Sequence, residues 1–149
     1  NLGAGTPDVF VLDTDHLTFL EHGRSVEADR LRARLQGLHA AEITVTIVSF
    51  EEQTRSWLTY LARARTLTQQ VDAYARLRRM VENYRLIPLL DFDKAAAVEY
   101  QRLSRSRLRI GTMDLKIAAI TLAHDATLIT RNLADFRKVP DLRVEDWSV

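Results

Sequence analysis

The fold of this chain is predicted first from Val9-Phe10-Val11-Leu12-Asp13-Thr14-Asp15, where four apolar residues of strand type run straight into an acidic residue. A short unbroken apolar run that ends in polar residues is typical of a buried strand in a parallel sheet. Open α/β sheets bind ligands at the carboxyl ends of such strands, so Asp13 stands at a candidate ligand site after the first, central strand. The alternative is that Asp13 or Asp15 only caps the helix that follows.

Outward from this strand, strand-type and helix-type segments alternate along the chain. The β-branched run 43–48 is the clearest second strand, and Ser49 is predicted to cap the next helix. The two helical segments that follow are expected to form an αα-hairpin. The apolar face predicted for the second of them consists of Val71, Tyr74, Leu77, Val81 and Tyr84.

The second half of the chain continues the alternation. Strands are predicted at 86–89, 127–130 and near 142–144, with the first of them at the sheet edge because Pro88 cannot donate to a ladder. Helices are predicted to start at Asp93 and at Thr112, the latter apolar almost all round. The pattern indicates an α/β fold with a central, mostly parallel sheet of four to five strands flanked by helices. We expect one domain over residues 1–149, with 1–7 as a disordered or expression-derived leader.

Composition excludes several classes of protein. Of the 149 residues, 46% are apolar and 28% are charged. The net charge is only +1, so the overall charge does not by itself indicate binding to a nucleic acid or to a membrane surface. The chain has no cysteine, which excludes disulfides and thiolate metal sites and is consistent with a reducing cytoplasm. No apolar run approaches membrane-spanning length. A cytoplasmic protein without membrane contact is therefore expected.

Acidic or amide residues recur at the ends of predicted strands or the starts of helices. They are Asp13, Glu52, Asp114, Asn132 and Asp135. In a parallel sheet these positions lie on the same side and can converge. Converging carboxylates repel unless a cation is present, and oxygen ligands without histidine or cysteine suit Mg²⁺ or Mn²⁺. Each residue taken singly, Glu51 and Asp135 above all, also has an ordinary interpretation as a helix cap.

Five short motifs, taken together, resemble the PIN-domain ribonucleases, and among them the VapC toxins of VapBC toxin–antitoxin pairs. The motifs are Leu12-Asp13-Thr14-Asp15, Thr46-Ile47-Val48-Ser49-Phe50-Glu51-Glu52, Gly111-Thr112-Met113-Asp114-Leu115-Lys116-Ile117-Ala118-Ala119, Thr130-Arg131-Asn132-Leu133-Ala134-Asp135-Phe136 and Val144-Glu145-Asp146-Trp147. The likeness covers about residues 9–147 in order. It implies a PIN-like fold in which the strands before Asp13 and Asn132 lie side by side.

The resemblance also implies roles for individual residues. Asp13 and Asp114 match acids that ligate Mg²⁺ or Mn²⁺, and Glu52 rather than Glu51 has the spacing of the second family acid, which also serves the metal. The fourth position falls at Asn132, where some relatives have Asp, with Asp135 just after it; either can complete the site. The implied reaction is metal-assisted hydrolysis of RNA phosphodiester bonds.

Several basic residues lie close to the acidic motifs in the sequence. Arg105, Arg107 and Arg109 precede Asp114 closely, and Arg131 lies in the fourth motif, directly before Asn132; they are candidate phosphate contacts, or else a solvated surface. The resemblance implies a homodimer, a VapB-type antitoxin bound through the helix pair 50–85, and a toxin–antitoxin hetero-oligomer. The four histidines have no ligand spacing with one another and are expected to be structural or surface residues.

Two other functions remain open at this point. The Asp-x-Asp after the first strand is also similar to the first motif of haloacid-dehalogenase-type phosphatases, in which the first Asp is a nucleophile. Against that, Leu17 replaces the usual Thr or Val and no paired acids occur late in the chain. The second alternative is a catalytically inactive PIN module that only binds RNA or an antitoxin.

Overall fold

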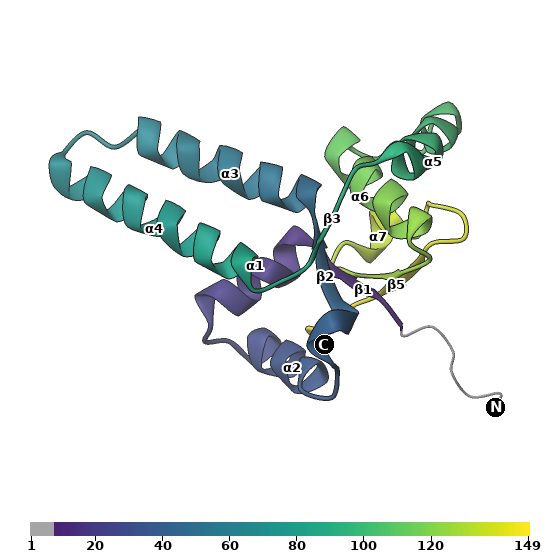
Figure 1. Ribbon diagram of the computed structural model, residues 1–149, viewed down its shortest axis with the longest axis horizontal. Helices are drawn as coiled ribbons and strands as arrows, with labels where there is room; N and C mark the ends of the chain where they lie inside the picture. Colours follow the sequence, from purple (N-terminus) through teal and green to yellow (C-terminus); the bar gives the residue numbers. More distant parts are fainter. Residues whose placement is uncertain (1–7) are drawn as a thin grey trace.

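The computed structural model describes residues 8–149 and contains a single five-stranded parallel sheet between two layers of helices (Figure 1). The strand order is β3-β2-β1-β4-β5. The strands are β1 (Phe10–Leu12), β2 (Ile43–Thr46), β3 (Leu89–Leu90), β4 (Thr127–Ile129) and β5 (Arg143–Glu145). The predicted α/β fold, the central place of the first strand and the edge place of the third are thus confirmed.

Helices connect every pair of consecutive strands. They are α1 (Thr14–His22), α2 (Val26–Leu35), the 3₁₀ turn η1 (Ala40–Glu42), α3 (Ile47–Ala62), α4 (Leu67–Arg85), α5 (Lys94–Arg105), α6 (Thr112–Ala123) and α7 (Leu133–Phe136). Within residues 8–149, none of them is long and apolar enough to cross a membrane.

The alternation of side chains along the short strands produces two cores, one on each face of the sheet. Val11 and Leu128 pack on one face with Ile117 of α6 and Phe136 of α7. Their neighbours Leu12 and Ile129 face the opposite core, with side chains of α1, α2 and α4. The two central strands, β1 and β4, are therefore buried on both sides, which explains the apolar residues on both of their faces.

The second strand is shorter than predicted, and Ser49 does not cap α3. Thr46 ends β2 and is itself the N-cap, because its side-chain oxygen accepts a hydrogen bond from the Ser49 N–H at 3.1 Å. β-Branched residues favour strands only weakly, and this capping bond starts the helix three residues earlier. Glu52 consequently lies in the second turn of α3. The edge strand likewise follows Pro88 at Leu89–Leu90, rather than containing it.

The predicted αα-hairpin is present: α3 and α4 extend together from the body of the molecule (Figure 1). The apolar face predicted for α4 is wrong in part, because Val71, Tyr74 and Val81 are exposed. The buried face of α4 carries Ala73 and Met80 instead. A hairpin that projects from the sheet packs on few neighbours, so periodicity alone does not identify its covered side. The predicted leader, residues 1–7, lies outside the described residues.

Candidate active site

Asp13 lies at the point where the connections of the sheet reverse direction. From β1 the chain builds outward through β2 to β3, and later returns to place β4 on the other side of β1. The register pairs Leu12 with Ile129, so Asp13 and Thr130 directly follow two adjacent parallel strands. Such a switch point leaves a crevice outside the carboxyl ends of the strands, where α/β proteins place ligands.

Asp13 is both a helix cap and a buried carboxylate. One of its oxygens accepts a hydrogen bond from the Thr14 N–H at 2.8 Å, and the other accepts one from the Thr130 hydroxyl at 2.7 Å. The residue is only 6% exposed. The pKa of Asp13 is raised to about 7, first by burial and then by the negative charges of Asp15 and Asp114, while the hydrogen bonds from Thr130 and Thr14 lower it in part.

Glu52 reaches the same site from α3. Its Oε1 accepts a hydrogen bond at 3.0 Å from the hydroxyl of Thr14, the residue whose N–H binds Asp13. Burial raises the pKa of Glu52, and the charges of Asp114 and Glu51 add to this effect while the Thr14 bond opposes it. Thr14 therefore links the two carboxylates through its backbone and its side chain.

Glu51, the acid next to Glu52, is placed differently. Its carboxylate forms an ion pair with Arg55 at 2.6 Å, one turn along α3. It lines an apolar hollow with Phe50 and Phe92, away from Thr14. Successive residues of a helix point about 100° apart, so only one of two adjacent acids can face the crevice.

Asp114 lies in the first turn of α6 and is half-buried. Burial raises the pKa of Asp114, and the negative charges of Asp135 and Asp15 raise it further. Asp13 and Glu52 also respond to the charge of Asp114. The three acids predicted from different parts of the chain are therefore electrostatically coupled.

The residues after β4 form the rim of the crevice. Asn132 donates its side-chain amide to Asp135 at 3.1 Å, and Lys138 forms an ion pair with Asp135 at 3.1 Å. These hydrogen bonds, the one from Asn132 first, lower the pKa of Asp135. Asp135 is thus near enough to act on Asp114 but already has two partners, and the choice between Asn132 and Asp135 as the fourth site residue stays a prediction.

The site also contains polar residues that were not among the predicted site residues. Asp15 accepts hydrogen bonds from the Arg131 N–H at 3.0 Å and from the ring of buried His16 at 2.9 Å. His16 Nε2 in turn accepts the Trp147 N–H, so Nδ1 carries the proton given to Asp15. The Asp-x-Asp spacing was a signal for Asp15. Nothing local marked Thr130, whose partner Asp13 is 117 residues away in sequence.

The chemistry of this oxygen-rich set suits a hard divalent cation. Burial first, and then mutual repulsion, raises the pKa values of Asp13, Glu52 and Asp114, and a cation would favour their ionised forms and relieve the repulsion. Within residues 8–149, however, no three His, Asp or Glu side chains stand close enough to form a ready metal-binding group. The donor set therefore fits Mg²⁺ by its charge and ligand type, while the positions of its atoms do not define a coordination sphere.

The candidate phosphate-binding arginines fall into two groups. Arg105 ends α5, and Arg107 and Arg109 lie in the loop to α6 with positive φ angles of 50° and 57°. Such angles are strained for residues other than glycine and concentrate at functional sites. All three side chains are exposed, without an ion pair to any described residue. Arg131, in contrast, places its guanidinium over the ring of Phe19, 5.1 Å from the centroid.

Comparison with known proteins identifies the family to which this arrangement corresponds. The family model described as PIN domain matches residues 10–142. Ribonuclease VapC2 of Rickettsia felis is 34% identical over 66 residues, which are 42% of this chain; the match spans about half, 49%, of that relative. The tRNA(fMet)-specific endonuclease VapC of Salmonella typhimurium is 25% identical over 142 residues, covering 93% of this chain and 97% of the relative.

Solved structures show the same fold. VapBC-1 from nontypeable Haemophilus influenzae contains a chain that superposes with a TM-score of 0.74 at 20% identity, covering 95% of this chain and 99% of the other. A chain of DNA-bound VapBC from Salmonella typhimurium superposes with a TM-score of 0.72 at 22% identity, covering 94% and 98%. At these identities the likeness establishes the architecture alone.

Proposed function

The chain belongs to the PIN-domain family, and we propose that it is a metal-dependent endoribonuclease of the VapC type, the toxin of a type II toxin–antitoxin pair. The observation that carries this proposal is the coupled set of Asp13, Glu52 and Asp114 at the switch point of the sheet. Perturbed carboxylates that share a crevice are expected at catalytic sites. The names of the Rickettsia and Salmonella relatives, a ribonuclease and an endonuclease, support RNA as the substrate.

In this proposal Asp13 and Asp114 hold Mg²⁺ or Mn²⁺, and Glu52 with Asn132 or Asp135 completes the site. The cation would supply charge neutralisation at the scissile phosphate and activation of the attacking water. The two hydrogen bonds from Thr14 and Thr130 keep the Asp13 carboxylate in one orientation. Glu52, oriented by the Thr14 hydroxyl, would hold a water and accept its proton, and its raised pKa, which makes it a better base, supports this role.

The proposal includes partners. Several structural neighbours are VapBC complexes, which supports a VapB-type antitoxin for this chain as well. A homodimer and a toxin–antitoxin hetero-oligomer complete the proposed assembly. The family match favours the ribonuclease over the haloacid-dehalogenase-type phosphatase, whose nucleophile would be Asp13. An inactive module that only binds RNA or antitoxin is an alternative outcome of the experiment that follows.

The test is cleavage of total RNA with Mg²⁺, with Mn²⁺ or with excess EDTA, by the wild type and two matched variants. We expect cleavage only with a metal. Glu52→Gln should lower the rate by about 10- to 100-fold, the loss typical of residues that support a metal site. Glu51→Gln should change it little, because Glu51 is paired with Arg55. Full activity in EDTA would refute the metal site, equal effects of the two variants would refute the assignment of Glu52, and RNA binding without cleavage would indicate the inactive module.

Arg105 and Arg107 are expected to contact the RNA backbone beside this site. The double variant Arg105→Gln/Arg107→Gln should bind single-stranded RNA more weakly, and its affinity should depend less on salt. The slope of log affinity against log salt should flatten by about 0.7 for each phosphate that the variant no longer binds. The control is Arg78→Gln on α4, which removes the same charge from an ion pair with Glu82. If both proteins keep the wild-type slope, the loop arginines belong to the solvated surface.

A further inference from the structure

A groove between α1 and α3 begins at the candidate active site and leads away from it. Thr14 and Glu52, which are hydrogen-bonded to each other, form its mouth. Beyond them it is lined by Thr18 and Glu21 of α1 and by Gln53, Ser56 and Trp57 of α3, with a volume of about 200 Å³. This space accommodates a single nucleobase. An RNA strand that is cleaved at the carboxylates would place the nucleotide next to the cleaved bond in this groove.

The lining of the groove favours a base over a phosphate. It contains no Lys or Arg, and its two carboxylates would repel a phosphate. It contains instead an indole ring, hydroxyl groups and an amide. Proteins recognise single-stranded RNA with aromatic surfaces and with amide or hydroxyl hydrogen bonds to base edges.

Gln53 is the polar residue of the groove with an unsatisfied atom. Its amide nitrogen donates to Glu21 at 3.4 Å, which orients the group because an ionised carboxylate can only accept. Its side-chain oxygen is shielded from solvent and has no hydrogen-bond partner among residues 8–149. Native proteins rarely leave such an atom unpaired. The last torsion of a Gln side chain has a broad energy profile, so the amide can turn to meet a donor in the groove.

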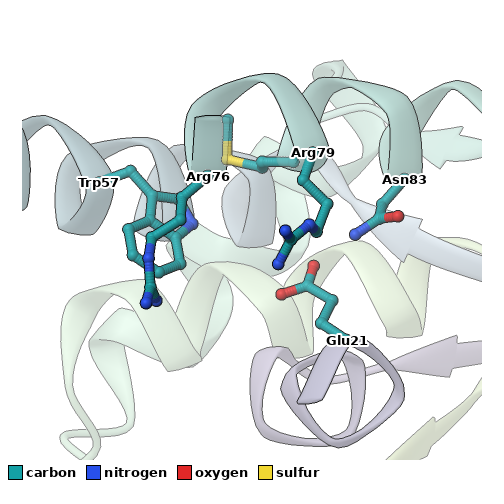
Figure 2. A pocket seen from close by; sticks show the side chains of 6 residues that line it. Glu21, Trp57, Arg76, Arg79 and Asn83 are labelled. Atoms are coloured by element: carbon teal, nitrogen blue, oxygen red, sulfur yellow. The ribbon is translucent and has the colours of Figure 1, made fainter. Parts of the chain in front are cut away.

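The far end of the groove is held in place by α4. Figure 2 shows Arg76 stacked on Trp57, and Arg79 and Glu21 pointing toward one another, in the adjoining hollow. The Arg76 guanidinium lies 5.4 Å from the centroid of the Trp57 ring. The indole also packs edge-on against Tyr60, with ring centroids 5.6 Å apart. These two contacts hold the Trp57 ring in one orientation, so it forms a fixed side of the groove.

A second, basic hollow lies next to the groove, along the C-terminal half of α3. It shares Ser56 with the groove, and its lining includes Arg55, Tyr60 and Arg63. If a base of an RNA strand occupies the groove, the sugar–phosphate backbone of that RNA would pass over Arg55 and Arg63, whose positive charges favour phosphates.

From these observations we propose that the α1–α3 groove is a base-recognition subsite for the nucleotide next to the cleaved bond and that it prefers guanine. This inference rests on the proposed ribonuclease function. The groove is lined mainly by acceptors: the Glu21 carboxylate, the Thr18 hydroxyl, whose proton is given to the Thr14 carbonyl at 2.8 Å, and, once the amide turns, the Gln53 oxygen. Guanine offers two adjacent donors, its ring N–H and its amino group. Uracil offers one donor between two acceptors and matches poorly.

The cleavage arm of the test uses a single-stranded RNA library with randomised sequence, sequenced after partial cleavage with Mg²⁺. The wild type should favour guanine over uracil at one flanking position by about tenfold or more. Gln53→Met and Ser56→Phe should reduce this preference to less than about threefold. Ser56 is exposed, so Ser56→Phe fills the groove without disturbing the core. The matched control, Gln101→Met on the exposed side of α5, should keep the wild-type preference.

The binding arm does not depend on cleavage. The chain has two tryptophans, and Trp147 is buried, so quenching of fluorescence by added nucleotide reports on Trp57. In EDTA, guanosine 5′-monophosphate should quench at concentrations about tenfold lower than uridine 5′-monophosphate, and Ser56→Phe should abolish the difference. If wild-type protein fails to cleave but shows this difference, the ribonuclease proposal falls, and the groove stands as a guanine-binding site without a cleaved bond beside it.

Equal quenching by the two nucleotides, or an unchanged base preference in both groove variants, would overturn the subsite. The same holds if the variants leave RNA behaviour unchanged and only weaken inhibition by an antitoxin, because the groove would then be a protein-binding surface.

Discussion

Asp13→Ala and Asp114→Ala are each expected to abolish RNA cleavage, with rates at least about 100-fold below wild type. Each removes a carboxylate that the proposed site uses to hold the cation, and the remaining acids cannot move to replace it because they belong to different elements. Cleavage of total RNA at a fixed Mg²⁺ concentration, followed as a time course, measures the effect.

The control has to distinguish a variant that is folded but cannot cleave RNA from a variant that is unfolded. Asp29→Ala removes an exposed carboxylate from the first turn of α2, where it pairs with Arg32, and should cleave at the wild-type rate. Far-ultraviolet circular dichroism and a thermal melt of each variant verify the fold, which matters most for Asp13 because its two hydrogen bonds anchor α1 and Thr130. A folded Asp114→Ala protein that cleaves at the wild-type rate would show that Asp114 is only an acid near a helix start.

The second large effect is on stability, and it requires no substrate. The pKa of Asp13 is about 7 in the folded protein and near 3.8 when unperturbed. Between these values the unfolded chain releases a proton that the folded protein keeps, so the free energy of unfolding falls as pH rises through this window. Each pKa unit corresponds to about 1.4 kcal/mol, so ionised Asp13 costs roughly 4 kcal/mol above pH 7. Metal-free protein should melt at a higher temperature at pH 5.5 than at pH 8.

Mg²⁺ binding and the removal of one negative charge should each restore part of the free energy of unfolding that is lost at high pH. At about 100 times its dissociation constant, Mg²⁺ should add roughly 2.7 kcal/mol, or about 5–10 °C in the melting temperature at pH 8. Asp114→Asn should raise the melting temperature of the metal-free protein by a few degrees, because burial and the charges of Asp135 and Asp15 disfavour the ionised side chain. The same variant should lose most of the Mg²⁺ shift.

Four melts at pH 8 decide the matter: wild type and Asp114→Asn, each with EDTA or with Mg²⁺. Asp29→Asn serves as the charge-matched control and should behave as wild type, since its side chain is exposed. If metal-free Asp114→Asn melts below wild type and keeps the full Mg²⁺ shift, Asp114 stabilises the start of α6 and is not a metal ligand.

The α/β class and the places of most strands were predictable because they depend on local patterns. The run ending at Leu12 is apolar on both faces, which only a strand covered by two layers requires, and the sheet confirms it. The boundary at Thr46 was wrong by about two residues because the start of α3 depends on one capping hydrogen bond rather than on propensity. The exposed face of α4 was missed because a projecting hairpin has few neighbours to mark its buried side.

For the site, the sequence by itself determined that an acid follows the strand at Asp13, that an amide follows the strand before Asn132 and that an acid occupies the start of α6, since those positions follow from chain order alone. Glu52 was expected in the first turn of its helix, but the cap at Thr46 puts it in the second turn. Only the tertiary structure decided which side chains act on one another. Thr14 links Asp13 to Glu52, Thr130 orients Asp13 across two strands, and Glu51 turns away to Arg55. The contacts of Glu52 with Thr14 and of Thr130 with Asp13 join residues 38 and 117 positions apart in the chain, and a hydrogen bond depends on distance and angle in space, which local sequence patterns do not encode.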